Sequence, residues 1–445
     1  MKELKNVLVI SSRPPFHSAG LGQDIIDALS ENGINVDYLT RFKYKNQPDN
    51  VISIRNEKPL IIMTLSRLLS FLRLDAIKRI IHRIKPQKSP YIINNNIEIK
   101  YPYEDNPAIP IEEVVNAINK DYDLVITLIW QDMITTETLK KIYHKINAPI
   151  LIYSPDMTPM TGGCFYFNNC TRYTQGCGFC PGLNSSILED NSRRNYYIKK
   201  DNYAQMNVSF LGNTWMNQYV KRSLLFPSDR IFKTEIVIDE VKFRPLNQTS
   251  IRRELGLPID GFIIMLRSTP DIRKGNKDMK RVIDKFVKKL TADEQTNVCI
   301  LTVGNDYFSS ICDISSTYSI FDLGIVDKTL LIKAYNASDL FLCASIDDAG
   351  PSMINQSLMC GTPVVSYKIG TTLDVIESGK SGFYSDIRDV NTMAENVHRI
   401  FELKLEQKAN IREFSREIAL MHNSKKAFYE SIKNIWSIVR DVNAC

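Results

Sequence analysis

Residues 335–366 read YNASDLFLCASIDDAGPSMINQSLMCGTPVVS, and this stretch decides the fold. Its apolar run Leu340–Cys343 predicts a short buried strand, and the polar run 345–351 predicts a loop. Ser352–Met359 then predicts a helix that stops before Gly361 and leads into a second apolar strand. This order of elements is typical of open α/β sheets, in which ligands bind where the parallel strands end. A helix N-terminus at that edge offers free backbone N–H groups, which suit a phosphate.

The rest of the chain repeats this alternation in two halves. Further strands are expected at Val7–Ile10, Val36–Leu39, Asp123–Thr127, Pro149–Tyr153, Phe262–Leu266 and Val298–Val303, and further helices at Asp24–Asn32, Lys277–Leu290 and Leu330–Tyr335. The alternation favours doubly wound, mostly parallel sheets. We therefore predict an α/β protein of two Rossmann-like domains, 1–235 and 236–424, that face one another across a cleft. A last helix within 425–445 is expected to cross back to the first domain.

The stretch 335–366 also resembles the sugar-nucleotide-binding signature of family 4 glycosyltransferases. That signature places an acidic residue after the strand, a glutamate eight positions later, and then a run similar to AmacGtPVV. Asp348 stands at the first acidic position, but Gln356 replaces the usual glutamate at the second. The resemblance implies the GT-B fold and transfer of a sugar from a nucleotide donor with retention of configuration. A glutamine amide can still accept a hydrogen bond from one ribose hydroxyl and donate to the other.

The resemblance also implies a set of donor-binding residues. The family places an arginine and a lysine after the first strand of the second half, where Arg267 or Arg273 and Lys274 stand. Preorganised cations at this place would stabilise the negative charge that a departing diphosphate gains. The alternative interpretation of these residues is a solvated basic loop without a ligand. The complete predicted donor set is Arg267, Arg273, Lys274, Gly324, Ile325, Asp348, Gly350, Pro351, Ser352 and Gln356.

Two loops of the first half are candidates for the acceptor side. The loop after the first strand holds His17, Gly20 and Gly22, and its glycines either line the site or make a tight turn. Asp156 follows the strand at 149–153 and, with Asp348, is one of two predicted catalytic residues. Asp156 is expected to act as a base toward the acceptor or to cap the turn that follows it.

Four cysteines lie in one glycine- and asparagine-rich loop, 162–183, which resembles a branch of the family with a DM-P-TGGC segment. Cys164, Cys170, Cys177 and Cys180 are separated by five, six and two residues. This spacing predicts a structural zinc site with four cysteine ligands, and free thiols or a disulfide are the alternatives. The chemistry itself requires no cofactor, because arginine, lysine and a helix N-terminus take the place of a metal.

Positive charge is concentrated in a predicted amphipathic segment, 61–88. Seven of the basic residues lie between Arg67 and Lys88 against the single acid Asp75, and this local excess equals the net charge of +6 of the whole chain. Such a segment suits an anionic membrane interface, or packs as an ordinary helix with a solvated basic face. Nucleic acid binding is disfavoured, since neither a pattern of aromatic residues between the charges nor a known motif accompanies this segment. No apolar run reaches eighteen residues and no signal peptide is recognised, so the protein is expected in the cytoplasm, peripheral at the inner face of the membrane.

These features together predict a glycosyltransferase that uses a UDP- or GDP-linked sugar. The expected acceptor is a saccharide, lipid-linked, in bacterial polysaccharide or glycoconjugate assembly. Two alternatives stay open. One is a non-catalytic homologue that binds nucleotide or a partner enzyme, which the replacement at Gln356 suggests. The other is a nucleotide-sugar epimerase, which would need more carboxylates and a histidine around the sugar.

Overall fold

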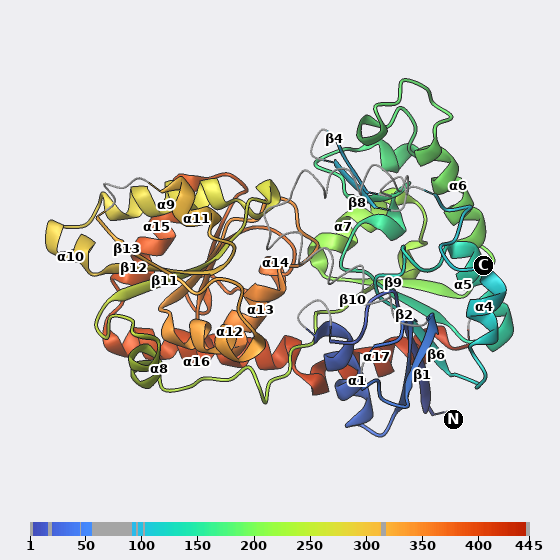
Figure 1. Ribbon diagram of the computed structural model, residues 1–445, viewed down its shortest axis with the longest axis horizontal. Helices are drawn as coiled ribbons and strands as arrows, with labels where there is room; N and C mark the ends of the chain where they lie inside the picture. Colours follow the sequence, from blue (N-terminus) through green and yellow to red (C-terminus); the bar gives the residue numbers. More distant parts are fainter. Residues whose placement is uncertain are drawn as a thin grey trace, which may run out of the picture.

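The computed structural model has two lobes, each built on a twisted parallel sheet (Figure 1). The described residues are 3–16, 20–44, 46–55, 91–94, 97–100, 103–312 and 317–441. The two sheets confirm the predicted α/β fold with two Rossmann-like domains. His17 and the basic segment 61–88 lie outside the described residues. Within the part of the chain that is described, no helix is long and apolar enough to span a membrane.

The first sheet has seven strands in the order β10-β9-β7-β6-β1-β2-β3, all parallel. Its strands are β1 Asn6–Ser11, β2 Asn35–Phe42, β3 Val51–Arg55, β6 Leu124–Thr127, β7 Ile150–Tyr153, β9 Val208–Gly212 and β10 Ile231–Lys233. Its helices are α1 Leu21–Ser30, α4 Ile111–Asn116, α5 Thr136–Ile146, α6 Asn191–Tyr203 and α7 Thr214–Ser223. Alternate residues of β1 face opposite ways: Val7 and Val9 join the core under α1, whereas Leu8 and Ile10 join the core under α4 and α5.

The first domain also contains a small antiparallel sheet, which was not predicted from the sequence. It consists of β4 Tyr91–Asn94, β5 Ile97–Lys100 and β8 Cys164–Tyr166, in the order β4-β5-β8. Because β8 belongs to the cysteine-rich loop 162–183, this sheet fixes where that loop lies. The sheet thereby brings two segments that are distant in the sequence to the side of the first domain nearer the cleft.

The second sheet has six parallel strands in the order β13-β12-β11-β14-β15-β16. They are β11 Phe262–Ser268, β12 Val298–Gly304, β13 Ser319–Asp322, β14 Leu340–Cys343, β15 Val364–Tyr367 and β16 Gly382–Ser385. The helices of this domain are α8 Gln248–Leu255, α9 Asn276–Val287, α10 Ala292–Thr296, α11 Tyr307–Ile311, α12 Lys328–Ala337, α13 Ser352–Met359, α14 Thr372–Val375, α15 Val390–Phe401 and α16 Leu405–Asn423. The predicted boundary near residue 235 falls between the last strand of the first sheet and the first strand of the second.

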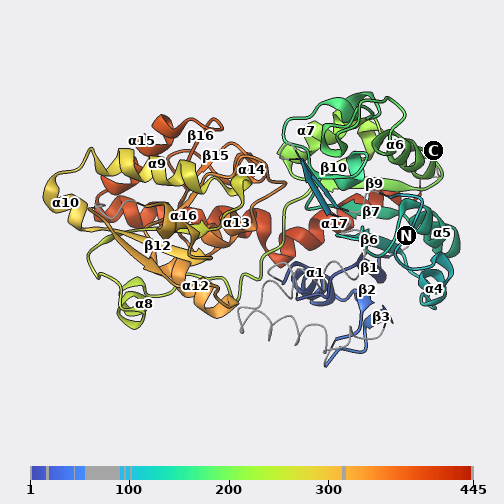
Figure 2. The ribbon, with the colours of Figure 1, turned by 45° about the horizontal axis from the view of Figure 1, so that its top comes forward.

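The last helix, α17 Lys425–Val439, returns to the first domain and packs beside α1 (Figures 1 and 2). Ser424 has extended backbone and caps α17, which separates it from α16. Trp436 lies in the core of the first domain, and its indole Nε1 donates to the carbonyl of Asp123 at 3.0 Å. Chain segments at both ends of the sequence therefore share one hydrophobic core.

We expect Trp436→Ala to lower the free energy of unfolding by about 3–5 kcal/mol, because it empties a large volume inside a packed core. The side chain of Trp436 is only 4% exposed, whereas Ile438 on the same helix is 51% exposed. Ile438→Ala is therefore the matched control and should change stability by less than about 1 kcal/mol. Urea unfolding followed by circular dichroism measures both. Equal effects of the two changes would show that α17 does not contribute to the core.

Candidate functional site

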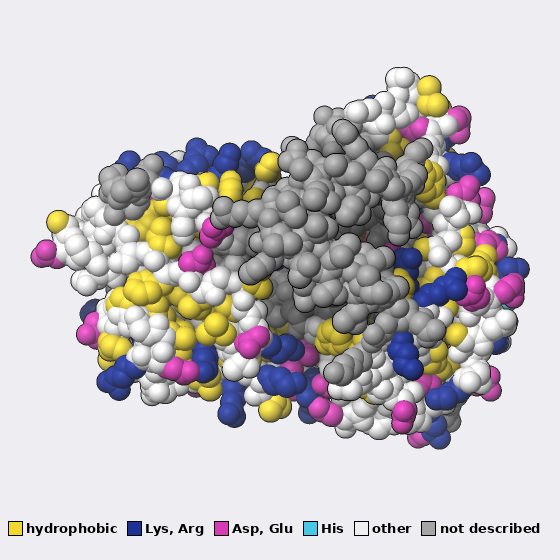
Figure 3. All heavy atoms as spheres, in the orientation of Figure 1, with side chains coloured by type: hydrophobic (Ala, Val, Ile, Leu, Met, Phe, Trp, Pro, Cys, Tyr) yellow, Lys and Arg dark blue, Asp and Glu magenta, His cyan; other side chains and the backbone are white. Residues whose placement is uncertain are grey.

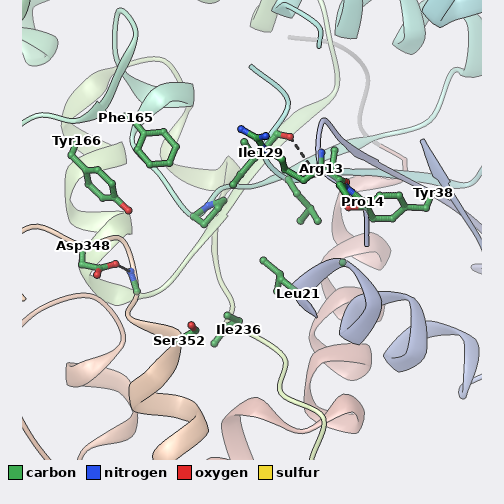
Figure 4. A pocket seen from close by; sticks show the side chains of 15 residues that line it. Arg13, Pro14, Leu21, Tyr38, Ile129, Phe165, Tyr166, Ile236, Asp348 and Ser352 are labelled. Carbon is green, nitrogen blue, oxygen red and sulfur yellow. Dashed lines mark hydrogen bonds between the residues drawn. The ribbon is translucent and has the colours of Figure 1, made fainter. Parts of the chain in front are cut away.

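A cavity of about 230 Å³ lies between the two domains, where strands of both sheets end (Figure 4). The first domain contributes the residues Ser11, Arg13, Pro14, Leu21, Gly22, Tyr38, Leu128, Ile129, Pro155, Phe165 and Tyr166. Ile236 and, from the second domain, Asp348, Gly350 and Ser352 complete the wall. Figure 4 shows Arg13 and Tyr38 on one side and Asp348 and Ser352 on the other. This arrangement confirms that the domains face one another across a cleft.

In the view of Figure 3, lysine and arginine side chains lie on the surface of both lobes, interspersed with acidic ones. Lys274 and Asp348 form an ion pair on the second-domain side of the cavity. Lys274 ends a short turn, Ile272–Lys274, that follows β11, and Asp348 lies in the loop after β14. β11 and β14 are hydrogen-bonded neighbours, so the loops that follow them meet at the same edge of the sheet. Gly275 makes the contact sterically feasible: its φ is +68°, and a Cβ there would lie 1.9 Å from the carbonyl oxygen of Ala344.

The N-terminus of α13 opens onto the same place. Its N-cap is Pro351, and no side chain caps the helix. Just before the helix, the Gly350 amide donates to Asp348 Oδ1 at 3.2 Å. A second cavity, of about 120 Å³, is lined by Arg267, Lys274 and the start of α13. Two cations and the positive end of a helix dipole therefore surround one small space, which suits the charge of a diphosphate.

The structure separates the two arginines that the sequence left as alternatives. Arg267 is exposed at the end of β11 and lines the smaller cavity with Lys274. Arg273 instead pairs with Glu98 of β5 at 3.2 Å and with Asp271 at 2.7 Å. Its guanidinium also stacks 3.8 Å from the centre of the Tyr166 ring. Arg273 thus joins the two domains, whereas Arg267 lines the smaller cavity, and a role in donor binding stays a prediction for both.

The cysteine-rich loop contacts the loop that follows β14. The Asn168 amide donates to Asp347 Oδ2 at 3.0 Å, and the Tyr166 hydroxyl points toward Asp348 in Figure 4. Burial raises the pKa of Tyr166, so its phenol stays protonated and able to donate. Sequence reasoning missed Glu98, Tyr166 and Asp347. The acidic pair at 347–348 was a signal for Asp347, whereas nothing local indicated the pairing of Glu98.

Three further residues of the predicted donor set line neither cavity. Gln356 is buried, and its Oε1 accepts a hydrogen bond from the Tyr335 hydroxyl at 3.1 Å. Gly324 and Ile325 follow β13 at the outer edge of the sheet, where Ile325 is 87% exposed. The contacts of these residues with ribose and base stay predictions. Pro351 and Ser352, by contrast, lie at the smaller cavity as the sequence suggested.

Of the residues predicted for the acceptor side, Gly22 lines the larger cavity, whereas Gly20 and Asp156 are not among its lining residues. Gly20 is the N-cap of α1, has a φ of +91° and lies next to Lys328 of the second domain. Asp156 is fully buried, and its Oδ1 accepts from the Thr158 amide at 2.7 Å. The carboxylate of Asp156 therefore accepts from the first amide of the turn Thr158–Met160, and Asp156 is not among the residues that line the cavity. Of its two predicted roles the geometry favours the local hydrogen bond within the turn, and the role as a base toward the acceptor stays a prediction.

The four clustered cysteines are free thiols without a disulfide. Burial raises the pKa of Cys177 to about 12 and also raises those of Cys164 and Cys180. In a zinc site made of four thiolates, all sulfur atoms lie within about 4 Å of one another. Among the described residues, the one set of three metal-ligating atoms within 4.8 Å belongs to three aspartates, not to these cysteines. The thiols as placed do not form a closed metal site, and zinc stays a prediction.

Residues 247–418 match the profile of the family described as Glycosyl transferases group 1. This region is a glycosyltransferase group 1 domain. A D-inositol 3-phosphate glycosyltransferase of Acidothermus cellulolyticus is 25% identical over 183 residues, which are 39% of this chain and 41% of that protein. An uncharacterized glycosyltransferase of Methanocaldococcus jannaschii is 22% identical over 41% of this chain and 44% of its own length. The match thus spans less than half the length of these relatives.

Solved structures extend the similarity to the whole fold. The sucrose-phosphate synthase of Thermosynechococcus elongatus superposes with a TM-score of 0.62 at 14% identity, over 98% of this chain and 99% of that one. Anabaena HepE in complex with UDP and glucose gives a TM-score of 0.58 at 12% identity, over 98% of this chain and 100% of that one. The two-domain architecture is therefore the GT-B fold.

Asp347 predicts a pH dependence of stability in this region. Burial raises its pKa from 3.8 to about 6, so the folded protein binds a proton that the unfolded chain releases. The free energy of unfolding should therefore fall as pH rises from about 4 to about 6. Asp347→Asn removes this pH-dependent fall in the free energy of unfolding, because an amide does not ionise, and it keeps an oxygen that can accept from the Asn168 amide. We expect the variant to be more stable than wild type by about 1–3 kcal/mol at pH 7.5 and equal to it near pH 4.

The comparison requires denaturant unfolding at both pH values, with the exposed Asp229→Asn as the control for a lost negative charge. A stability difference that stays constant between pH 4 and pH 7.5 would contradict the assignment to Asp347.

Proposed function

We propose that the protein is a retaining glycosyltransferase of family 4 that moves a sugar from a nucleotide-sugar donor to a hydroxyl of a saccharide acceptor. The observation that carries this proposal is the Lys274–Asp348 ion pair beside the uncapped N-terminus of α13. A donor diphosphate would lie in the smaller cavity between Arg267, Lys274 and the first amides of α13. The donor sugar would extend from there into the larger cavity, where Asp348 accepts hydrogen bonds from its hydroxyls.

The chemical argument rests on the leaving group. Cleavage of the glycosidic bond to a nucleotide places new negative charge on the diphosphate, and fixed cations and amides stabilise that charge best when water is excluded. Asp348 is the single carboxylate among the described residues that line the two cavities, and Lys274 neutralises it. A covalent intermediate on an enzyme carboxylate is therefore disfavoured. We propose front-face attack by the acceptor, with the leaving phosphate as its proton acceptor.

For the donor we propose a UDP-linked sugar first and a GDP-linked sugar second. Structures of Anabaena HepE, which shares the fold, contain UDP, UDP with glucose, or UDP-glucose. For the acceptor we propose a lipid-linked saccharide used in polysaccharide or glycoconjugate assembly at the inner face of the membrane. The predicted amphipathic segment 61–88 would hold the protein at that surface.

One observation favours a second candidate, a homologue that binds nucleotide without turnover. Gln356 stands where a ribose-binding glutamate is expected, and Tyr335 holds its amide oxygen inside the domain. Nucleotide binding without product, across a broad panel of acceptors, would favour this candidate. Gln356→Glu tests it directly, because a restored carboxylate should then strengthen nucleotide binding.

Lys274→Gln should weaken binding of UDP-glucose, or of the nucleotide sugar that binds best, at least about tenfold, since charge-assisted hydrogen bonds contribute roughly 1.5–3 kcal/mol. Thermal-shift assays and titration calorimetry with UDP, GDP and their sugar conjugates measure the effect. Lys277→Gln is the matched control, because Lys277 is exposed nearby at the start of α9.

Loss of Lys274 leaves Asp348 unpaired, so a general loss of stability must be separated from a loss of binding. The double variant Lys274→Gln/Asp348→Asn removes both charges and should regain stability without regaining nucleotide affinity. Wild-type affinity in the double variant would overturn the proposed donor site.

A further inference from the structure

The first domain holds a cluster of buried polar atoms that no group in the described chain satisfies. They belong to the loops and strand ends at the carboxyl edge of β1, β2 and β6. The atoms are Ser12 Oγ, Arg41 Nε, Thr127 Oγ1, Asp132 Oδ1 and both amide atoms of Gln131. Ser12, Thr127 and Asp132 are only 4%, 0% and 6% exposed. Buried polar groups are satisfied in most proteins, so a cluster of this size calls for a ligand or ordered water.

The strand register places Arg41 and Thr127 on one face of the sheet, and Ser12, Gln131 and Asp132 lie in the loops that follow β1 and β6. Ile10 of β1 pairs with Leu39 of β2 and with Thr127 of β6. Residues two positions apart in a strand point the same way, so Arg41 lies on the face of Leu39, and Ser12 continues the face of Ile10. Neighbouring strands therefore bring their polar groups together at the edge where α/β sheets bind ligands.

Two arginines share a single acid at this edge. Arg13 lies 3.5 Å and Arg41 3.9 Å from Asp132 Oδ2, and Arg41 also donates to the Asp132 carbonyl. Asp132 is the one acid within ion-pair distance of either guanidinium among the described residues. Two positive charges against one negative charge leave a net charge of +1 next to buried hydroxyls. The side chains of Arg13 and Arg41 are 41% and 26% exposed, so an incoming anion can reach the charge that Asp132 leaves unbalanced.

Arg13 connects this cluster with the proposed active site. It lines the larger cavity opposite Asp348 and Ser352, as Figure 4 shows. A ligand that reaches Arg13 and the cluster therefore has its other end near the donor sugar. Guanidinium groups bind phosphate oxygens with paired hydrogen bonds, and hydroxyl and amide groups can complete the shell.

We propose that Arg13, Arg41, Ser12, Thr127 and Gln131 form a subsite for a phosphate group of the acceptor, with Asp132 positioning the two arginines. This inference rests on the proposed glycosyl transfer and narrows its acceptor to a phosphorylated saccharide. The phosphate belongs either to a soluble sugar phosphate or to a lipid diphosphate that carries the saccharide. Both sources present the same chemistry to the subsite.

Titration calorimetry of the wild-type protein, saturated with the nucleotide that binds it best, tests the subsite. The probes are inorganic phosphate, glucose 6-phosphate, glucose, and a polyprenyl diphosphate-linked N-acetylglucosamine in detergent micelles. We expect a phosphorylated probe to bind at least about tenfold more tightly than glucose. Arg13→Gln and Arg41→Gln should each weaken that binding at least about tenfold, while Arg13→Lys keeps part of it. Binding of the soluble probe or of the lipid-linked probe alone identifies the source of the phosphate.

Arg55→Gln is the matched control, because Arg55 ends the neighbouring strand β3 and pairs with Glu113 at the surface. Nucleotide affinity and thermal midpoints are recorded for every variant, so that misfolding is recognised. Nucleotide binding without binding of any phosphorylated probe, or phosphate affinity that is equal in wild type and both glutamine variants, would overturn the subsite and leave the proposed function standing. Phosphate binding without any nucleotide binding would support the subsite and count against glycosyl transfer.

Discussion

The ion pair between Lys274 and Asp348 joins two loops that are 74 residues apart in the sequence. It exists because β11 and β14 are adjacent parallel strands, and parallel neighbours end at the same edge of a sheet. Gly275 lets the first loop pass close to the backbone at Ala344, which brings the lysine within reach. The same edge carries the start of α13, so a cation, a carboxylate and free amides come together without any long insertion. The rest of the site depends on this meeting of strand ends.

Contacts between the two domains also depend on the loops that follow β11 and β14. Arg273 stands one residue before Lys274 and reaches Glu98 and Tyr166 of the first domain, while Asp347, one residue before Asp348, accepts from Asn168. Each of these two loops therefore carries one residue of the Lys274–Asp348 ion pair and one neighbour that contacts the opposite domain. Any movement of the first domain against the second must act on these loops directly. The small antiparallel sheet matters for this reason, because β5 and β8 supply Glu98 and Tyr166.

The elements that local pattern determines were predicted well. The strand Leu340–Cys343 and the helix Ser352–Met359 have the predicted bounds, since apolar runs and helix signals are properties of short segments. The resemblance placed Lys274 and Asp348 at one site, and the parallel register explains why they meet. The sequence could not show that Arg273 pairs with the first domain. Its partner Glu98 lies in a small sheet whose strands β5 and β8 are far apart in the sequence. The burial of Asp156 likewise depends on the turn that packs over it, and the cysteine spacing did not determine how the four thiols are placed relative to one another.

Each side of the cleft carries polar or charged groups that lack a full set of partners within the described chain. The second domain presents an uncapped helix N-terminus and cations around a small space, whereas the first presents buried hydroxyl and amide groups and two arginines on one acid. Unsatisfied groups of this kind lower the stability of the free protein, and a ligand that satisfies them recovers that free energy as affinity. A neutral ligand could satisfy the hydroxyls, but it would leave the two guanidinium groups with one carboxylate between them. Excess positive charge on both walls therefore favours two anionic substrates that approach one another. Asp348, already neutralised by Lys274, adds little repulsion to either of them.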